Sequence, residues 1–525
     1  MMMLRGSVSQ FIFRVALAAV AGSVCAFAQP DAVQVYEPIN VERGVFNAKA
    51  KGTITPGGHA QEVFLGRIPF TGLEVPLNTP DQALQSAPIP HASATLPTGV
   101  IQGLGVGFTG FTVQYAPPDT NAAVSAKHIV QWVNAAYGIY DRASGVWSGP
   151  FAGNTPWLGF GGGCEKNNDG DPIIKYDRAH DRWVYTQFSV SNKPYLQCFA
   201  VSAVGDPGTI SVRWAYSFGN KDFPDYPKMG VWPSGYFLSF NIFKNGFSFS
   251  GPLACAVDSA TAIAGGSPKM ICNQLSSSTG SLLPSDLDGP TAPPPNSPNY
   301  FVAFGSNSLQ FWKFTPNFAA GTATFTGPAT VPVSAFSRAC SGGTCIPQPG
   351  TTQKLDSLAD RLMYRNAYSY RNGVESIVLN HSVTPGNGAA SGIRWYEVRI
   401  SSGSFSIAQQ STFSPDSNSR WMGSVAMNNA GTIAVGYSVS STSVNPGIRF
   451  TGRCSGDPSN SMQAEVNAVP GFGSQLPSLN RWGDYSSIVV DPADDSKFWF
   501  TTQYLQNNGT FNWSTAIVPI TFTCP

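Results

Sequence analysis

The sequence from Val113 to Pro525 consists of short strand-like runs separated by turn residues, and this pattern limits the fold more than any other feature. Runs of about 5–9 residues, rich in β-branched and aromatic side chains, recur throughout. Examples are HIVQWVN (His128–Asn134), RWVYTQFSV (Arg182–Val190) and KFWFTTQYL (Lys497–Leu505). Several runs alternate with period two, and no stretch of about 12 residues carries a helical apolar stripe. The pattern predicts an all-β chain.

The composition agrees with this fold class and excludes several functions. Charged residues make up 12% of the chain, about half of the usual 25%. Aromatic residues also reach 12% and can fill a large core. The formal net charge of +1 provides no basic surface for nucleic acid. A helical bundle, a coiled coil, an acidic disordered protein and a nucleic-acid-binding protein are therefore not expected.

A longer repeat is superimposed on the strand pattern. Arg420-Trp421 and Arg481-Trp482, 61 residues apart, each precede a glycine, a strand, an Asn/Asp-rich turn and a second strand. Looser versions of this scheme, each opening on a polar cluster, give repeat starts near Pro117, Asn168, Phe223, Pro284, Ala359, Ser419 and Asn480. Repeats of this kind predict a β-propeller, whose blades bury their faces against one another. We expect seven blades over residues 106–525; six or eight blades, and a pair of β-sandwiches, are the alternatives.

A shorter echo occurs within two of these repeats. Tyr140-Asp141 and Tyr176-Asp177 are each followed, six residues after the aspartate, by a tryptophan. The pattern resembles the Tyr-Asp…Trp element of kelch blades and is close to the Asp-box of sialidase propellers. In both families the element is structural, so the aspartate is expected to cap a turn while the tryptophan packs between sheets.

The amino-terminal residues have the pattern of an export signal. Arg5 and Arg14 precede an apolar run that ends in Ala26-Phe27-Ala28, which predicts a signal peptide over residues 1–28 with cleavage after Ala28. Lipidation at Cys25 and an uncleaved anchor are the alternatives. Residues 29–105, rich in Pro, Gly, Ala and Thr, are expected to form an extended arm or linker. No transmembrane segment is expected after cleavage, which places the protein outside the cell, at its surface or in the periplasm.

Eight cysteines remain after this cleavage, and an even number in an exported chain predicts disulfides. Sequence proximity favours the pairs Cys340–Cys345, Cys255–Cys272, Cys164–Cys198 and Cys454–Cys524. Buried free thiols are the alternative. No C-x-x-C motif is present, which argues against zinc and thioredoxin-type chemistry.

In a propeller, the polar clusters that open the repeats converge on one end of the central channel. The residues expected to bind a ligand there are Asp119, Asp171, Asp225, Asp288, Arg361, Arg420, Arg481 and Asp484. Arginines can hold carboxylates, and aspartates accept hydrogen bonds from hydroxyl groups. The alternative is that these residues cap turns and join neighbouring blades through ion pairs.

Three of these arginines suggest a more specific chemistry. Arg361, Arg420 and Arg481 open successive repeats, and three arginines around one carboxylate is the sialidase arrangement, with Tyr364 or Tyr485 and Glu375 available as the nucleophilic pair. True Asp-boxes and a clear acid/base residue are missing. A sialidase-like glycoside hydrolase is therefore the alternative to a binding protein.

Only calcium is suggested as a bound ion. Asn167, Asp169 and Asp171 alternate around Gly170, as oxygen ligands do at the start of a calcium loop, although the later bidentate Glu is absent. An Asx turn is the alternative. The five histidines show no metal-binding spacing, and the sequence has no G-x-S-x-G motif or P-loop. No other cofactor is expected.

The strings HIVQWVN, GDPIIKYDRAHDRW, FPDYPKMGVWPSGYF, LLPSDLDGP, RWMGS and RWGDYSSIVVDP together resemble a large family of exported bacterial proteins of unassigned function. The resemblance covers Pro117 to Pro525. It implies a propeller shape and export, and it assigns no catalytic residue. The expected function is an extracellular or cell-surface binding module for a glycan or a protein; whether it is also an enzyme, and its oligomeric state, stay open.

Overall fold

A computed structural model describes residues 33–52, 61–62, 66–70, 76, 79–90, 94–95, 97–113 and 115–525. The expected signal peptide and its cleavage site lie outside these residues. In the part of the chain that is described, no helix is long and apolar enough to cross a membrane.

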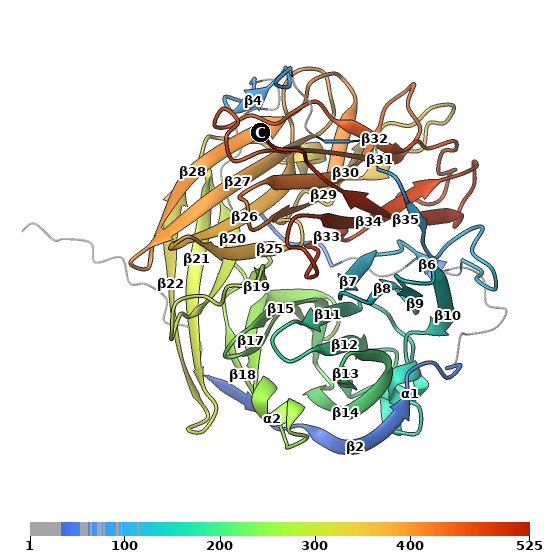
Figure 1. Cartoon of the computed structure of the whole chain (residues 1–525), viewed down its shortest axis with the longest axis vertical. Helices are drawn as coiled ribbons and strands as arrows, with labels where there is room; N and C mark the ends of the chain where they lie inside the picture. The colour runs from blue at the N-terminus through green and yellow to red at the C-terminus, as the bar shows by residue number, and fades with distance from the viewer. Residues whose placement is uncertain are drawn as a thin grey trace, which may run out of the picture.

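The first strands of successive repeats form a ring around a central axis (Figure 1). Each contacts the first strand of the next repeat, and the last contacts the first, which closes the ring. These strands are β7 (Asn121–Val124), β11 (Ile173–Asp177), β15 (Asp222–Trp232), β19 (Leu283–Asp288), β25 (Asn366–Arg371), β29 (Ser419–Met427) and β33 (Ser487–Val490). A closed ring is the geometry of a β-propeller and excludes a pair of sandwiches.

Each first strand begins a four-stranded antiparallel unit that extends outward from the axis. In the first four units, the outer strands are β8 (His128–Val133), β9 (Ala136–Asp141), β10 (Val146–Ala152), β12 (Arg182–Ser189), β13 (Tyr195–Ala203), β14 (Asp206–Gly219), β16 (Gly235–Lys244), β17 (Ser248–Val257), β18 (Met270–Gln274), β20 (Asn299–Gly305), β21 (Ser308–Asn317) and β22 (Thr322–Pro332). The remaining outer strands are β26 (Val374–Val383), β27 (Gly392–Ser401), β28 (Ser404–Phe413), β30 (Ile433–Ser440), β31 (Gly447–Arg453), β32 (Val466–Val469), β34 (Phe498–Leu505) and β35 (Trp513–Ile520).

The last unit is completed from the other end of the chain. Its fourth strand is β5 (Ile101–Gln102), which pairs with β35 through Ile101 and Ile517. The expected arm therefore contributes a strand to the propeller, whose boundary falls before residue 106. This strand was not predicted, because a two-residue strand leaves no periodic pattern in the sequence.

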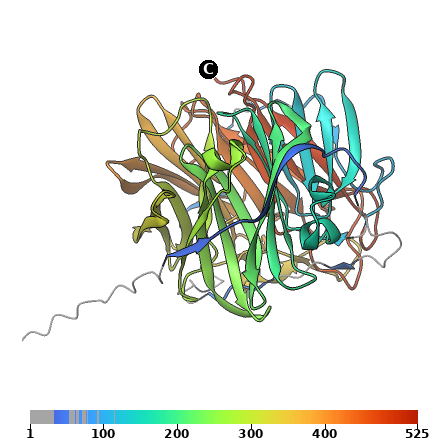
Figure 2. The same cartoon turned by 90° about the horizontal axis from the view of Figure 1, so that it is seen from below.

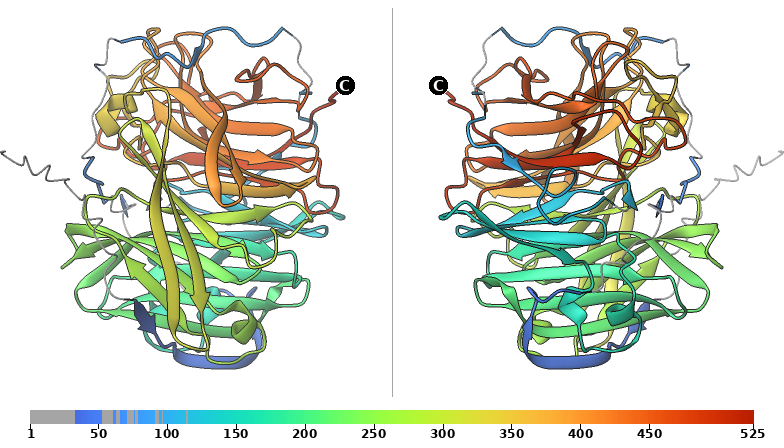
Figure 3. Two further views of the ribbon diagram at one scale, coloured as in Figure 1. Left: turned by 90° about the vertical axis from the view of Figure 1, so that its left-hand side faces the viewer. Right: turned by 90° about the vertical axis from the view of Figure 1, so that its right-hand side faces the viewer.

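Other parts of the arm lie along the outer edges of the sheets, as the blue segment in Figures 2 and 3 shows. β1 (Gln34–Tyr36) pairs with β18, β2 (Ile39–Asn47) with β14, and β4 (Leu84–Gln85) with β28. These pairings cover backbone groups that an edge strand would otherwise leave open to pairing with another chain. Two further pairs of short strands are present. β3 (Gln61–Glu62) is parallel to β6 (Tyr115–Ala116), and β23 (Thr344–Ile346) is antiparallel to β24 (Leu355–Asp356).

Among the residues that the structure describes, helix is confined to short segments: α1 (Gly162–Lys166), α2 (Ser259–Ile263) and the 3-10 turns at Thr155–Trp157 and Ala339–Gly342. The Tyr-Asp…Trp elements have the predicted structural role. Trp147 pairs across the sheet with Tyr140, and Trp183 with Tyr176, with ring centroids 5.3 and 5.1 Å apart. Asp141 caps its turn by accepting hydrogen bonds from the backbone of residues 143 and 144.

All four predicted disulfides are confirmed. Cys255–Cys272 joins the neighbouring strands β17 and β18, and Cys164–Cys198 joins α1 to β13. Cys340–Cys345 closes a short loop, and Cys454–Cys524 connects the residue after β31 to the carboxyl-terminal segment. Disulfides are typical of oxidising compartments, and this agrees with a protein that acts outside the cytoplasm.

Candidate functional site

A cavity of about 510 Å³ lies where the first strands end. β7, β11, β15, β19 and β33 all contribute lining residues from their carboxyl ends or from the turns that follow. Asp177, His180, Trp232, Asp288 and Arg365 are among these residues. The ring of strands thus places polar side chains from several repeats around one concave site.

A buried charge network lies beneath this central pocket. Arg365, which directly precedes β25, donates from Nε to Asp286 Oδ2 (2.6 Å) and from Nη2 to Asp288 Oδ1 (2.7 Å). Lys175 of β11 also donates to Asp286, whose other oxygen accepts from the backbone N–H of Val231 at 3.0 Å. Asp286 is therefore fully engaged. The Asp288 Oδ2 atom, in contrast, has no hydrogen-bond partner in the described part of the chain.

The network gives its two carboxylates different acidities. Burial by itself would raise the pKa of Asp286, but Arg365 and Lys175 hold it below the usual range. Burial raises the pKa of Asp288 despite its contact with Arg365. Burial also lowers the pKa of Lys175 to about 8. Asp286 is thus kept as an anion, while Asp288 takes up a proton more readily.

His180 and Asp177 form a second polar pair at the pocket. The His180 Nδ1 atom is 2.8 Å from Asp177 Oδ2, which also accepts from the Tyr236 hydroxyl at 3.1 Å. A carboxylate at Nδ1 favours the tautomer with a proton there and leaves Nε2 as an acceptor. The His180 side chain is 44% exposed, so this nitrogen is accessible to a ligand.

Sequence reasoning missed most of this pocket. Asp288 was expected to bind a ligand, but Lys175, His180 and Arg365 were not. In the sequence, Lys175 and Arg365 are not distinguishable from other charged residues near strand ends. They meet only because the ring of first strands brings their repeats together. The spacing of Asp177 and His180 in the turn after a strand could have indicated this pair. A turn of three residues can bring a histidine side chain back to the aspartate that opens the turn.

The repeat-start residues meet at the other end of the channel, before the first strands. The backbone N–H of Asp484 donates to Asp119 Oδ1 at 2.8 Å, and Arg481 pairs with Asp484 at 2.6 Å. One carboxylate oxygen from each of Asp119, Asp171 and Asp484 lies within 4.8 Å of the other two. Asp225 and Arg361 lie close enough to this group to influence its charges. The structure therefore brings together Asp119, Asp171, Asp225, Arg361, Arg481 and Asp484, all of them buried.

This second cluster is covered by the arm. Gly66 accepts a hydrogen bond from Arg361 Nη2 at 2.8 Å, and the backbone N–H of Ile68 donates to Asp360 Oδ2 at 3.1 Å. Ile68 itself is buried. The cluster is thus an enclosed site rather than an open mouth.

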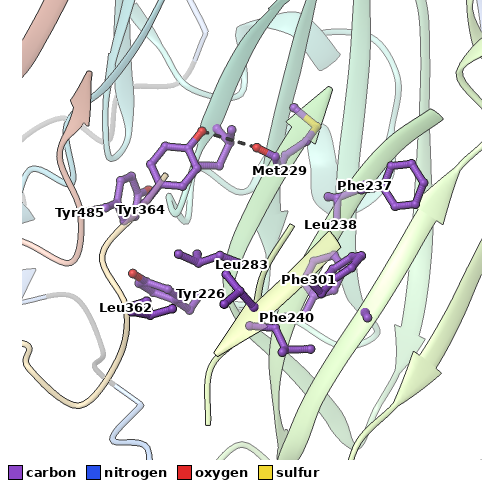
Figure 4. Packing of buried hydrophobic residues seen from close by; sticks show 14 of the residues in the cluster. Tyr226, Met229, Phe237, Leu238, Phe240, Leu283, Phe301, Leu362, Tyr364 and Tyr485 are labelled. Atoms are coloured by element: carbon purple, nitrogen blue, oxygen red, sulfur yellow. Dashed lines mark hydrogen bonds between the residues drawn. The ribbon is translucent and has the colours of Figure 1, made fainter. Parts of the chain in front are cut away.

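The three arginines proposed for a sialidase-like site do not act together, because each is committed to a carboxylate of its own. Arg420 pairs with Glu465 and Asp416, Arg361 with Asp360, and Arg481 with Asp484. Glu375 accepts from Tyr368 at 2.7 Å, whereas Tyr364 and Tyr485 are buried in the core (Figure 4). Their ring centroids lie 6.1 Å apart, and the Tyr364 hydroxyl donates to the Met229 carbonyl. No three-arginine clamp for a carboxylate is formed by these side chains.

The three residues expected to form a calcium loop, Asn167, Asp169 and Asp171, do not converge on one point. Asp169 Oδ2 accepts from the backbone N–H groups of Val190 and Ser191, which follow β12, and Asn167 donates to Ser189 at 2.9 Å. Only Asp171 joins the enclosed carboxylate cluster. Its backbone has a φ of 45°, which reverses the chain between the two parts.

Comparisons with known proteins gave structural neighbours only: no family model and no curated protein matches the chain. An ulvan lyase is 12% identical with a TM-score of 0.35, covering 79% of this chain and 97% of its own. An α-L-arabinofuranosidase from Fusarium graminearum is 9% identical, with a TM-score of 0.35 and coverage of 81% and 98%. The WD40 domain of SCAP from fission yeast is 10% identical, with a TM-score of 0.34 and coverage of 78% and 96%. The propeller assignment rests on the strand pairing described above.

Proposed function

We propose that this protein is an exported propeller that binds a carbohydrate in its central pocket. The observation that carries the proposal is the Asp288 Oδ2 atom, which has no hydrogen-bond partner among the described residues and belongs to a residue only 8% exposed that lines the cavity. A buried carboxylate oxygen without a donor is costly. A sugar hydroxyl supplies the missing donor, and His180 offers a second polar contact at the same pocket.

The form and charge of the pocket favour a sugar over a protein ligand. Its volume falls in the range of roughly 300–1,000 Å³ that is typical of small-molecule sites, whereas protein partners use broad surfaces of about 800 Å² on each side. Lys175, Arg178 and Arg365 are all paired with aspartates. With its cations already neutralised, the pocket suits an uncharged, hydroxyl-rich ligand.

A glycan array followed by calorimetry on the mature chain tests this proposal. His180→Ala should weaken binding of the best oligosaccharide. His128→Ala is the matched control, because His128 is also a partly exposed histidine beside an aspartate, Asp141, but lies outside the pocket. Equal losses in both variants, or no binding to any glycan, would contradict the assignment of the pocket.

Glycoside hydrolysis is a second candidate, because the pKa values of Asp286 and Asp288 are shifted in opposite directions. Such a pair separates an acid from an anion. In this reaction Asp288 donates its proton to the leaving glycosidic oxygen as the C–O bond breaks. A water forms the new bond to the anomeric carbon and loses its proton to His180. Hydrolysis of a fluorogenic glycoside by the parent protein that disappears in Asp288→Asn would favour the enzyme. Binding without turnover by the parent protein would favour the binding module.

A further inference from the structure

Four carboxylates from four repeats lie inside the channel at the end opposite the pocket. Asp119 precedes β7, Asp171 precedes β11, Asp225 lies near the start of β15 and Asp484 precedes β33. None is more than 5% exposed. We call these four residues the enclosed acid cluster.

The members of the enclosed acid cluster are unequally satisfied. Asp119 accepts from the Asp484 N–H and from Asn134 Nδ2, and Asp484 accepts from Arg481. Asp225 accepts no hydrogen bond from any residue that the structure describes, although it is 5% exposed. After burial, the neighbouring charge of Asp171 contributes most to raising the pKa of Asp225, to about 8. An unpartnered carboxylate therefore faces another carboxylate in a buried space.

The cations nearby do not neutralise this group. Arg361 is paired with Asp360, and Arg481 is paired with Asp484. The ammonium of Lys228 is fully buried, but it donates to the Pro227 carbonyl at 2.9 Å and lies 3.5 and 3.8 Å from the ring centroids of Tyr226 and Tyr485. Within the described residues it makes no ion pair at 4.0 Å or less. Four buried carboxyl groups thus lie beside the two cations Arg481 and Lys228.

A further oxygen lies beside the cluster without a partner. Asn134 is 1% exposed, and its Oδ1 atom has no hydrogen-bond partner in the described part of the chain, while its Nδ2 atom contacts Asp119. A Cβ atom on Gly170, next to Asp171, would lie 1.8 Å from this oxygen. The oxygen therefore lies against Gly170, the residue before Asp171, where the backbone leaves room only for glycine.

We propose that the enclosed acid cluster holds one hard divalent cation, with calcium as the preferred ion. The carboxylates of the cluster and Asn134 Oδ1 offer oxygen atoms, which are the ligand type of calcium and magnesium. Several converging carboxylates favour calcium, because it accepts many direct protein oxygens, whereas magnesium usually retains water ligands.

The arm would enclose the bound ion. A Cβ atom at Gly66 would lie 2.3 Å from Asp225 Oδ2, so the glycine allows the backbone to lie directly over the carboxylate. Gly66 is also fixed to Arg361. The ion would connect the repeats containing β7, β11, β15 and β33 and would exchange slowly with solvent.

The test uses the mature full-length chain, freed of metal by chelation and then incubated with calcium chloride. Elemental analysis after desalting should find one calcium per chain, and calcium should raise the midpoint of thermal unfolding relative to the chelated protein. Asp171→Asn should weaken calcium binding by about 10–100-fold or more. The same variant should raise the midpoint of the chelated protein, because it removes a buried carboxylate that lies beside other carboxyl groups.

Asp169→Asn is the matched control, since Asp169 lies two residues away and caps a turn. It should retain one calcium. If Asp171→Asn does not fold, Asp225→Asn provides the same comparison. The proposal is overturned if the parent chain binds no calcium and shows no change in midpoint, or if Asp169→Asn loses the ion while Asp171→Asn keeps it.

Discussion

Replacing Arg365 by methionine tests whether the charge network beneath the pocket is held together as described. The guanidinium is 1% exposed and makes contacts of 2.6–2.7 Å with Asp286, Asp288 and the Ile488 carbonyl. After the change, Asp286 keeps Lys175 and the Val231 N–H, but Asp288 keeps no donor among the described residues. Removing one partner of a buried ion pair costs about 3–5 kcal/mol, and we expect a loss of that size.

A second substitution determines whether the orphaned charge is the cause. Arg365→Met combined with Asp288→Asn leaves an unsatisfied amide in place of an anion, with an expected residual loss of about 1–3 kcal/mol. The double variant should therefore be more stable than the single variant. Urea unfolding with the disulfides intact, followed by tryptophan fluorescence, measures both differences.

The pH dependence provides an independent check. Since the pKa of Asp286 is lowered in the folded state, its stabilising contribution is present above its usual value and is lost as the pH falls through the lowered value. The difference in free energy of unfolding between the parent protein and Arg365→Met should become smaller below about pH 4. A loss under about 1 kcal/mol at neutral pH, or a double variant less stable than the single one, would refute the reasoning.

Three further predictions concern other parts of the molecule. Cys454→Ser with Cys524→Ser opens a disulfide spanning 70 residues and should lower the free energy of unfolding by about 4 kcal/mol through chain entropy. Removing the disulfide Cys340–Cys345, which spans 5 residues, should cost about 2 kcal/mol. A larger loss for Cys340–Cys345 in urea unfolding would contradict this. The pKa of Lys175 is lowered from 10.5 to about 8 in the folded protein, so its contribution to the free energy of unfolding should rise between pH 8 and pH 10.5. The parent protein should therefore become more stable relative to Lys175→Met over that range. A stability difference that does not change with pH would contradict the lowered pKa. Gly66→Ala introduces contacts of 2.3–2.4 Å with Asp225 and Phe243 and should cost about 1–3 kcal/mol; limited proteolysis should then cut the arm faster, and an unchanged rate would show that the arm is not held there.

The fold was predictable because its signals are local. Alternating apolar runs specify strands, and similar polar openings specify repeats, whatever the distant partners are. The disulfides followed from proximity in the sequence, because neighbouring strands of one unit bring their cysteines together, as Cys255 and Cys272 show. The strand β5 was not predictable, because two residues carry no period and their partner lies at the far end of the chain.

The site was predictable only where repeat position decides it. Asp119, Asp171 and Asp484 occupy equivalent places before their first strands, so a ring brings them together. Arg420 occupies a comparable place, but the nearby Glu465 takes up its charge. The pocket depends on Lys175, Asp286 and Arg365, which meet only in three dimensions and whose spacing in the sequence follows no rule.

The pairing of β5 with β35 makes the order of synthesis matter. Ile101 emerges from the ribosome long before Ile517, its partner, so the ring cannot close until nearly the whole chain has been synthesised. Until then the backbone groups of β5 lack their partners in β35. The blades already formed must also stay folded without a neighbouring blade on one side. A chain truncated before β35 would therefore lose its final blade and also leave the first one uncovered, and damage at either terminus would spread around the circle.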